Sequence, residues 1–282
     1  MGRGNRSTGS RAFPAAGARR GGMGRLVIGL VVAGIALLSY CSSSEFNPVT
    51  GEKQYVSLTP KQEIALGLQA LPEMMAQHGG AHADESLQAV VDRIGRQLVT
   101  ASAARETGWQ FDFHLLADPE TVNAFALPGG QVFITYALFR QLESPAQLAG
   151  ILGHEIGHVV ARHSAQRMAK ADLTQGLLGA VVVASESASS AQVAAVVGQM
   201  VNMKFGRDDE LESDRLGVVF MSNAGYDPRA MIGVMEILAR AGGGARQPEF
   251  FSTHPNPDNR IMQIRQAIDE IFPDGVPPGL ED

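Results

Sequence analysis

An uncharged apolar stretch lies near the N-terminus of the chain. Residues 26–40 form a run of fifteen positions without an acidic or basic side chain. Such a run is shorter than the roughly 20 apolar residues that a spanning helix needs, but it is long enough for the core of a signal peptide. We therefore predict a signal or anchor segment over residues 26–41.

Further along, several segments carry apolar residues at the spacing of an amphipathic helix. In residues 84–100 the aliphatic positions share one helical face: Leu87, Val90, Val91, Ile94 and Leu98. Thr59 followed by Pro60 predicts the start of another helix, which extends to Gln77. Further helices are expected over residues 229–240 and 258–271, with a turn over residues 225–228.

Two regions between these helices alternate like strands. Residues 109–115 predict one strand, with His114 on its polar side as a surface or hydrogen-bonded residue and not a metal ligand. Residues 123–126 and 131–135 predict two strands joined by a tight Pro-Gly-Gly turn. This hairpin is either plain sheet structure or an edge that pairs with an extended peptide.

The apolar run over residues 148–160 contains an H-E-x-x-H pattern. His154 and His158 are four residues apart, so on a helix they lie about 40° apart around the axis and point to one place. They are candidate zinc ligands, and Glu155 is a candidate general base for a metal-bound water. Ser144 followed by Pro145 is typical of a helix start, which supports the helix.

A catalytic zinc usually has three protein ligands, so another donor must follow. The acidic segment over residues 208–215 offers Glu210 and Asp214 on one helical face, whereas Glu212 lies about 200° from Glu210. Spacing alone leaves open which carboxylate binds the metal. His163, extrapolated along the H-E-x-x-H helix, is expected to face outward or to be structural.

Together these patterns resemble the zinc metallopeptidases of the prenyl-protein (CAAX) endopeptidase / HtpX / BepA family. Over roughly residues 47–270, the resemblance is carried by the H-E-x-x-H, by Glu210-x-x-x-Asp214 with Ser213, by residues 122–130 and by residues 252–257. It implies a mainly helical α+β zincin (gluzincin) domain with a small β-sheet beside the H-E-x-x-H helix. It also implies one zinc per chain.

The resemblance assigns further roles within the site. Glu210 falls on the family's remaining metal ligand, and Asp214 on a residue outside the ligand set that we expect to orient a zinc histidine. His254 falls on a histidine implicated as an occasional extra ligand. It could cover the open metal position or donate to the oxyanion. A loop-pinning role without catalysis is the alternative for His254.

The N-terminal region bears on where the protein is held. Cys41 is the single cysteine, which excludes an internal disulfide, and residues 38–41 partly resemble a lipoprotein cleavage box, although Tyr40 stands where a small residue is expected. Residues 47–52 look like the start of lipoprotein members of the same family. A lipid on Cys41, an uncleaved signal anchor and plain secretion all remain open. The expected organisation is a basic flexible region (1–25), the signal or anchor segment (26–41), a linker (42–58), the metallopeptidase domain (59–272) and a flexible tail (273–282).

Charge excludes one class of partner. The residues before Cys41 include six arginines and no acid, which leaves 17 basic against 29 acidic residues from Cys41 onward, a net charge of −12. A body with this negative charge repels the phosphate backbone of nucleic acids, so nucleic-acid binding is not expected.

The apolar runs in residues 172–203 are too short and too interrupted to span a bilayer. It predicts a helical hairpin packed on the body, or alternatively a lid or membrane-leaning flap.

The sequence thus predicts a membrane-attached zinc metalloendopeptidase on the periplasmic, extracytoplasmic side. Its expected substrates are polypeptides, in particular misfolded or stalled cell-envelope proteins, as the resemblance implies. The alternative is a periplasmic chaperone or assembly factor that uses the same peptide groove with little or regulated proteolysis. A purely structural zinc is disfavoured because such sites are commonly closed and rich in thiolates.

Overall fold

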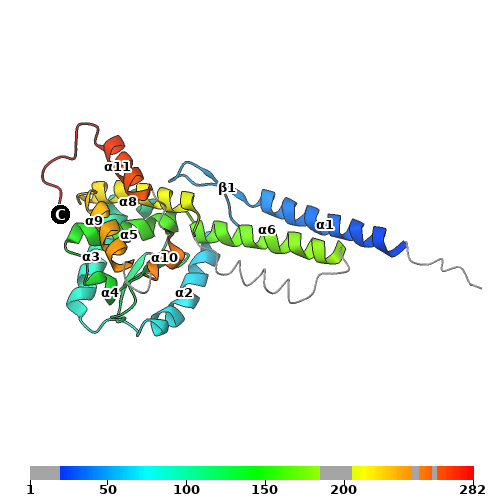
Figure 1. The fold of residues 1–282 in the computed structure, drawn as a ribbon, viewed down its shortest axis with the longest axis horizontal. Coiled ribbons are helices and arrows are strands. Elements are labelled where there is room, and N and C mark those ends of the chain that lie inside the picture. The colour runs from blue at the N-terminus through cyan, green and yellow to red at the C-terminus, as the bar shows by residue number, and fades with distance from the viewer. Residues whose placement is uncertain (1–19, 185–204, 243–247, 256–258) are drawn as a thin grey trace, which may run out of the picture.

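The computed structural model describes residues 20–184, 205–242, 248–255 and 259–282. A body that contains the sheet lies at one end, and helices α1 and α6 extend from it side by side (Figure 1). The helices are α1 (Arg20–Ser42), α2 (Pro60–Gln77), α3 (Glu85–Ala101), η1 (Ala103–Glu106), α4 (Tyr136–Phe139), α5 (Pro145–Val160), α6 (His163–Ala184), α8 (Arg207–Ala224), α9 (Ala230–Gly242), α10 (Phe250–Thr253) and α11 (Arg260–Ile271). The strands are β1 (Ser44–Phe46), β2 (Lys53–Tyr55), β3 (Asp112–Leu116), β4 (Ala124–Ala126) and β5 (Gln131–Thr135). The predicted α+β class is confirmed.

The larger sheet has the strand order β3-β5-β4. β3 runs parallel to β5, and β4 runs antiparallel to β5 with Ala124 opposite Ile134, so the predicted hairpin is confirmed. Its turn requires glycine at position 129, because Gly129 has a φ of +85° and an added Cβ would lie 2.4 Å from the Cα of Ile64 in α2. His114 is hydrogen-bonded as predicted, with its Nε2 2.9 Å from Oε1 of Gln131.

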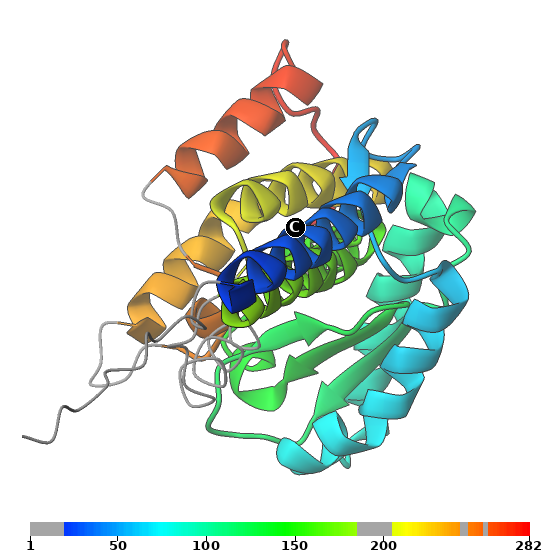
Figure 2. The ribbon, with the colours of Figure 1, turned by 90° about the vertical axis from the view of Figure 1, so that its right-hand side faces the viewer.

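Helix α5 lies between this sheet and α8 (Figure 2). Small residues on both helices permit a close approach: a Cβ added to Gly157 would lie 3.1 Å from the backbone of Ser213, and one added to Gly153 would lie 3.4 Å from Gly217. Nearly the whole of α5 is buried. The polar residues of the H-E-x-x-H pattern therefore face α8 at short range and away from bulk water.

Helices α1 and α6 form an extended pair. Gly176 of α6 approaches α1 so closely that an added Cβ would lie 2.6 Å from the Cβ of Ala36. The segment Met23–Ser42 is long and apolar enough to cross a membrane by length and composition, and most of its large apolar side chains are exposed. The prediction that residues 172–203 pack on the body is wrong for residues 172–184. These continue α6 along α1, where Gly176 lies against Ala36. Residues 185–203 lie outside the described ranges.

The expected linker over residues 42–58 contains the β1–β2 hairpin, which caps the C-terminal end of α5. Asn47 donates from Nδ2 to the carbonyl of Val160 at 2.8 Å, and Gln54 donates from Nε2 to the carbonyl of Ala161 at 2.7 Å. These side chains satisfy carbonyl groups that a helix end leaves without intrahelical partners. The domain boundaries themselves stay a prediction, but the hairpin is attached to the helix that carries the candidate site.

Candidate metal centre

Helix α5 begins where the sequence predicts, and it brings the two histidines together. Ser144 caps the helix by accepting from the backbone N–H of Gln147, and Pro145 is the first helical residue. The imidazoles of His154 and His158 are both 3% exposed, and their Nε2 atoms lie 3.1 Å apart. One turn of helix thus directs two nitrogen donors to a single buried point.

Helix α8 supplies the carboxylate. Glu210 is fully buried, with Oε2 3.5 Å from Nε2 of His154 and Oε1 3.4 Å from Nε2 of His158. Asp214, on the same face one turn later, lies behind His154 instead, with Oδ1 2.9 Å from its Nδ1. Of the two carboxylates that spacing left open, Glu210 is the one directed into the cluster.

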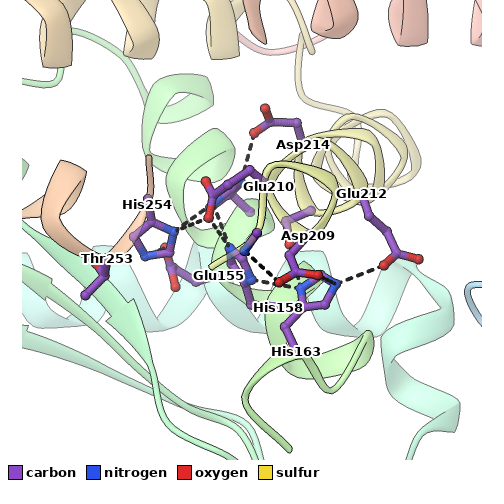
Figure 3. A network of polar contacts seen from close by, with 12 residues as sticks. Glu155, His158, His163, Asp209, Glu210, Glu212, Asp214, Thr253 and His254 are labelled. Atoms are coloured by element: carbon purple, nitrogen blue, oxygen red, sulfur yellow. Dashed lines mark hydrogen bonds and ion pairs between the residues drawn. The ribbon is translucent and has the colours of Figure 1, made fainter. Parts of the chain in front are cut away.

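A histidine from a distant loop completes the group. His254, which follows α10, is buried with Nδ1 3.0 Å from Oε1 of Glu210 and 3.4 Å from Nε2 of His154. Figure 3 shows His254 and Glu210 pointing toward one another above His158. One ligand atom from each of His154, His158, Glu210 and His254 lies within 4.8 Å of all the others. Such a group can hold a metal ion.

Glu155 borders this group without belonging to it. Its carboxylate is 1% exposed, and Oε1 has no hydrogen-bond partner, although Nε2 of His254 lies 3.6 Å away. Burial raises the pKa of Glu155, and the nearby rings of His254 and His154 offset only part of that rise. Glu155 is therefore a carboxylate whose free oxygen faces the donor cluster.

The residues present fit a divalent cation. Oε1 of Glu155 and Nε2 of His254 are buried atoms without hydrogen-bond partners, which native interiors rarely tolerate. The carboxylates of Glu155, Glu210 and Asp214 are all buried here, and Arg260 is the buried guanidinium beside them, so acidic side chains outnumber arginines around the donor cluster. Imidazole nitrogen combined with carboxylate oxygen suits zinc and similar divalent metals.

Arg260 is the site residue that sequence reasoning missed. It is 1% exposed and donates from Nε and Nη2 to the two carboxylate oxygens of Asp214, at 2.6 and 2.8 Å. Its Nη1 also lies 3.0 Å from Oε2 of Glu210, within ion-pair distance but not aligned as a hydrogen bond. Burial opposes ionisation of Asp214, but the charge of Arg260 and the hydrogen bonds from His154 and Arg260 together outweigh it and lower the pKa of that carboxyl. One signal was available: Arg260 opens helix α11, where a cation is disfavoured by the helix dipole.

His163 also lies in the site. Of the two alternatives expected for His163, the outward-facing one is wrong and the structural one agrees with the structure, because the histidine is 1% exposed and its Nδ1 lies 2.9 Å from Nδ1 of His158. Helix α5 ends at Val160, and Arg162 adopts a left-handed φ of 57°, so the chain turns before His163 begins α6. The outward direction followed from extending α5 as a straight helix to His163, although α5 ends three residues earlier.

Comparison with known proteins decides the family. Residues 85–268 match peptidase family M48. The chain belongs to peptidase family M48. This M48 chain is 30% identical over 260 residues to the beta-barrel assembly-enhancing protease of Escherichia coli K12. The alignment covers 88% of this chain and 52% of that protein. The beta-barrel assembly-enhancing protease of Yersinia pestis is 30% identical over 258 residues. That alignment covers 88% of this chain and 52% of the relative.

A second group of relatives is eukaryotic. The mitochondrial metalloendopeptidase OMA1 of Schizosaccharomyces pombe is 29% identical over 253 residues, covering 86% of this M48 chain and 72% of the relative. The chain spans about half the length of the beta-barrel assembly-enhancing proteases that it matches. The predicted resemblance is confirmed, because the chain belongs to a family of metallopeptidases.

Proposed function

We propose that this M48 chain is a zinc-dependent metalloendopeptidase in which His154, His158 and Glu210 hold the metal and Glu155 is the general base. The observation that carries the proposal is the buried donor cluster with the unpartnered Oε1 of Glu155 beside it. Zinc held there would supply a Lewis acid that polarises the scissile carbonyl and lowers the pKa of the attacking water.

The chain's own groups carry the proton transfers. Glu155 accepts the proton of the attacking water at its free oxygen and then donates it to the leaving amine. Burial raises the pKa of Glu155, and a rise in pKa makes a carboxylate a stronger proton acceptor. Asp214, held by Arg260, accepts the Nδ1–H of His154 and so keeps the other ring nitrogen free to bind metal.

The edge of the larger sheet supports substrate binding. β4 is an edge strand of that sheet and contacts α5, the helix that carries His154 and Glu155. An extended peptide that pairs with β4 would be held through main-chain groups, independently of its sequence. The segment before His254 already contacts this edge, because the N–H of Phe250 donates to the carbonyl of Val122 at 3.3 Å.

We place His254 provisionally in the catalytic set. Its Nδ1 lies 3.0 Å from Oε1 of Glu210 and 3.4 Å from Nε2 of His154, so the ring would cover the site until a substrate carbonyl displaced it, and it could then donate to the oxyanion. This closed arrangement also supports a second candidate function, a chaperone or assembly factor with little or regulated proteolysis. A loop-pinning role for His254 would instead leave activity unchanged when the ring is removed.

The location of the protein is part of the proposal. Helix α1 is exposed and apolar over Met23–Ser42, which supports attachment of the body to a membrane either through this helix or through a lipid on Cys41. The resemblance to bacterial members, and relatives named for beta-barrel assembly, support an extracytoplasmic body and envelope proteins as substrates. Cys41→Ser should release the chain from membranes if the lipid is the anchor and leave it bound if α1 is.

The test measures zinc per chain and casein cleavage by the detergent-solubilised full-length protein. Glu155→Gln should keep one zinc and lose cleavage by about 10²–10⁴-fold, the usual contribution of a general base. Glu120→Gln, an exposed carboxylate outside the site, is the matched control and should change neither quantity. Glu210→Ala should lose zinc. Wild-type cleavage by Glu155→Gln would exclude Glu155 as the base.

A separate assay distinguishes the two candidate functions. Cells lacking the protein are complemented with either the wild-type gene or the Glu155→Gln variant. A peptidase predicts rescue by the wild type alone, because only its Glu155 carboxylate can accept the proton. Equal rescue by both would favour the chaperone, whose peptide groove the substitution leaves intact.

A further inference from the structure

The two histidines of α5 differ in what supports their outer nitrogens. Nδ1 of His154 lies 2.9 Å from the carboxylate of Asp214, a direct contact with an anion that is itself held by Arg260. Nδ1 of His158 lies 2.9 Å from another imidazole, that of His163. An ionised carboxylate can only accept a hydrogen bond, whereas a neutral imidazole can donate one or accept one. Another group must therefore determine whether His163 donates to Nδ1 of His158 or accepts from it.

That determinant is Glu212. Its Oε2 lies 2.9 Å from Nε2 of His163, on the opposite side of the ring from His158 (Figure 3). Because the ionised carboxylate accepts only, His163 must carry its proton on Nε2. A neutral His163 then has a bare Nδ1 and accepts the Nδ1–H of His158. His158 in turn has a bare Nε2, the atom that faces the donor cluster.

The opposite tautomer would disable the site. If His163 donated from Nδ1, His158 would accept at Nδ1 and carry its proton on Nε2, where it could not bind a metal. We infer that His163 and Glu212 form a positioning pair that holds His158 in its metal-binding tautomer. This inference rests on the proposed function, since it gives a role to residues behind a proposed zinc ligand.

Local structure holds the pair in place. Arg162, immediately before His163, is fixed by Glu63, to which it donates from Nε at 2.9 Å, so the turn that directs His163 inward is anchored to α2. Ser213 lies with Oγ 3.3 Å from Nδ1 of His163 and can donate to the same lone pair. The Arg162 contact fixes the direction of the ring, and the Ser213 hydroxyl, when it donates, favours a bare Nδ1 on His163.

The two supports also differ in exposure. The side chain of Glu212 is 27% exposed, whereas that of Asp214 is 2% exposed. Substitution at Glu212 therefore tests the pair at a position that tolerates change, even where a substitution of buried His163 disturbs folding. Loss of such an outer partner typically weakens metal binding by about 10–100-fold.

The experiment measures the zinc dissociation constant of the detergent-solubilised full-length protein by competition with a chromogenic chelator. His163→Leu should weaken binding by about 10–100-fold, because no acceptor remains for Nδ1–H of His158. His163→Asn should restore most of the affinity, since its carbonyl oxygen can replace the ring Nδ1 as acceptor. Glu212→Leu should weaken binding and Glu212→Gln should not. His114→Asn, at a hydrogen-bonded histidine outside the site, is the control.

Thermal melting of the zinc-free variants separates positioning from general stability. A positioning role predicts that affinity follows the acceptor, so that Leu and Asn at position 163 differ in zinc binding more than in melting temperature. Unchanged zinc affinity in both His163→Leu and Glu212→Leu would overturn the inference alone. A wild-type chain that binds no zinc would overturn the proposed function and the inference with it.

Discussion

Replacing Arg260 with methionine should strongly destabilise the protein, because it keeps the length of the side chain but removes its charge. The guanidinium is 1% exposed and pairs with Asp214 and Glu210, which are 2% and 0% exposed. Removal of one partner of a buried ion pair costs about 3–5 kcal/mol, since the remaining charge stays buried without compensation. For a domain of this size, that corresponds to a fall in melting temperature of about 6–20 °C.

The assay is thermal and urea unfolding of the full-length protein with a chelator present, so that differences in metal binding do not contribute. Arg229→Met is the matched control: this arginine pairs with Asp227 but is 61% exposed, and its loss should cost no more than about 1 kcal/mol. The double variant Arg260→Met/Asp214→Asn should be more stable than the sum of the single effects by about 0.5–3 kcal/mol. This coupling is expected because both charges then leave together.

Two results would refute this reasoning. A destabilisation by Arg260→Met no larger than that of the exposed control would show that Asp214 and Glu210 do not depend on the guanidinium. Strict additivity in the double variant would show that Arg260 and Asp214 act independently, despite the 2.6 and 2.8 Å contacts between them.

Other positions give further predictions. Arg162→Ala should lower the free energy of unfolding by about 3–5 kcal/mol in urea titrations, because Glu63 is left buried without its partner; wild-type stability would contradict this. Gly157→Val should force α5 and α8 apart and reduce zinc content measured by atomic absorption, whereas Gly179→Val, with open space at its Cβ, should not. Burial opposes ionisation of Asp118, but backbone and histidine donors outweigh it and lower its pKa. Asp118→Asn should therefore cost about 1–2 kcal/mol at pH 7. That difference should shrink as the pH falls below the unfolded value of about 3.9, and a constant difference would exclude this origin.

Capping and turn residues in the sequence were sufficient to predict helix α5, which carries His154 and His158, and the neighbouring helices and hairpin. Thr59, Asp84 and Ser144 each cap the helix that they were expected to begin or precede, and the Pro-Gly-Gly turn joins two antiparallel strands. These predictions succeeded because capping and turn chemistry depend on neighbours in sequence. The pairing of His154 with His158 succeeded for the same reason, since helical periodicity alone fixes it.

The rest of the site depends on contacts between distant residues. Arg260 reaches Asp214 across 46 positions, and His163 reaches Glu212 across 49. No periodicity links such pairs. His163 was further obscured because Arg162 takes up a left-handed conformation that usually belongs to glycine, so the sequence carries no ordinary stop signal at the end of α5.

The region that matches the family is smaller than the set of residues that shape the site. The match begins at residue 85. The turn that directs His163 toward His158, however, depends on Glu63, which accepts hydrogen bonds from the guanidinium of Arg162 and so anchors that residue. A non-glycine residue in the left-handed region costs about 1–2 kcal/mol, so Arg162 keeps this conformation only where its surroundings fix it. Asn47 then closes the end of α5 two residues before Arg162, by donating to the carbonyl of Val160. The residues before position 85 therefore take part in positioning His158, the proposed metal ligand, through the turn that they stabilise.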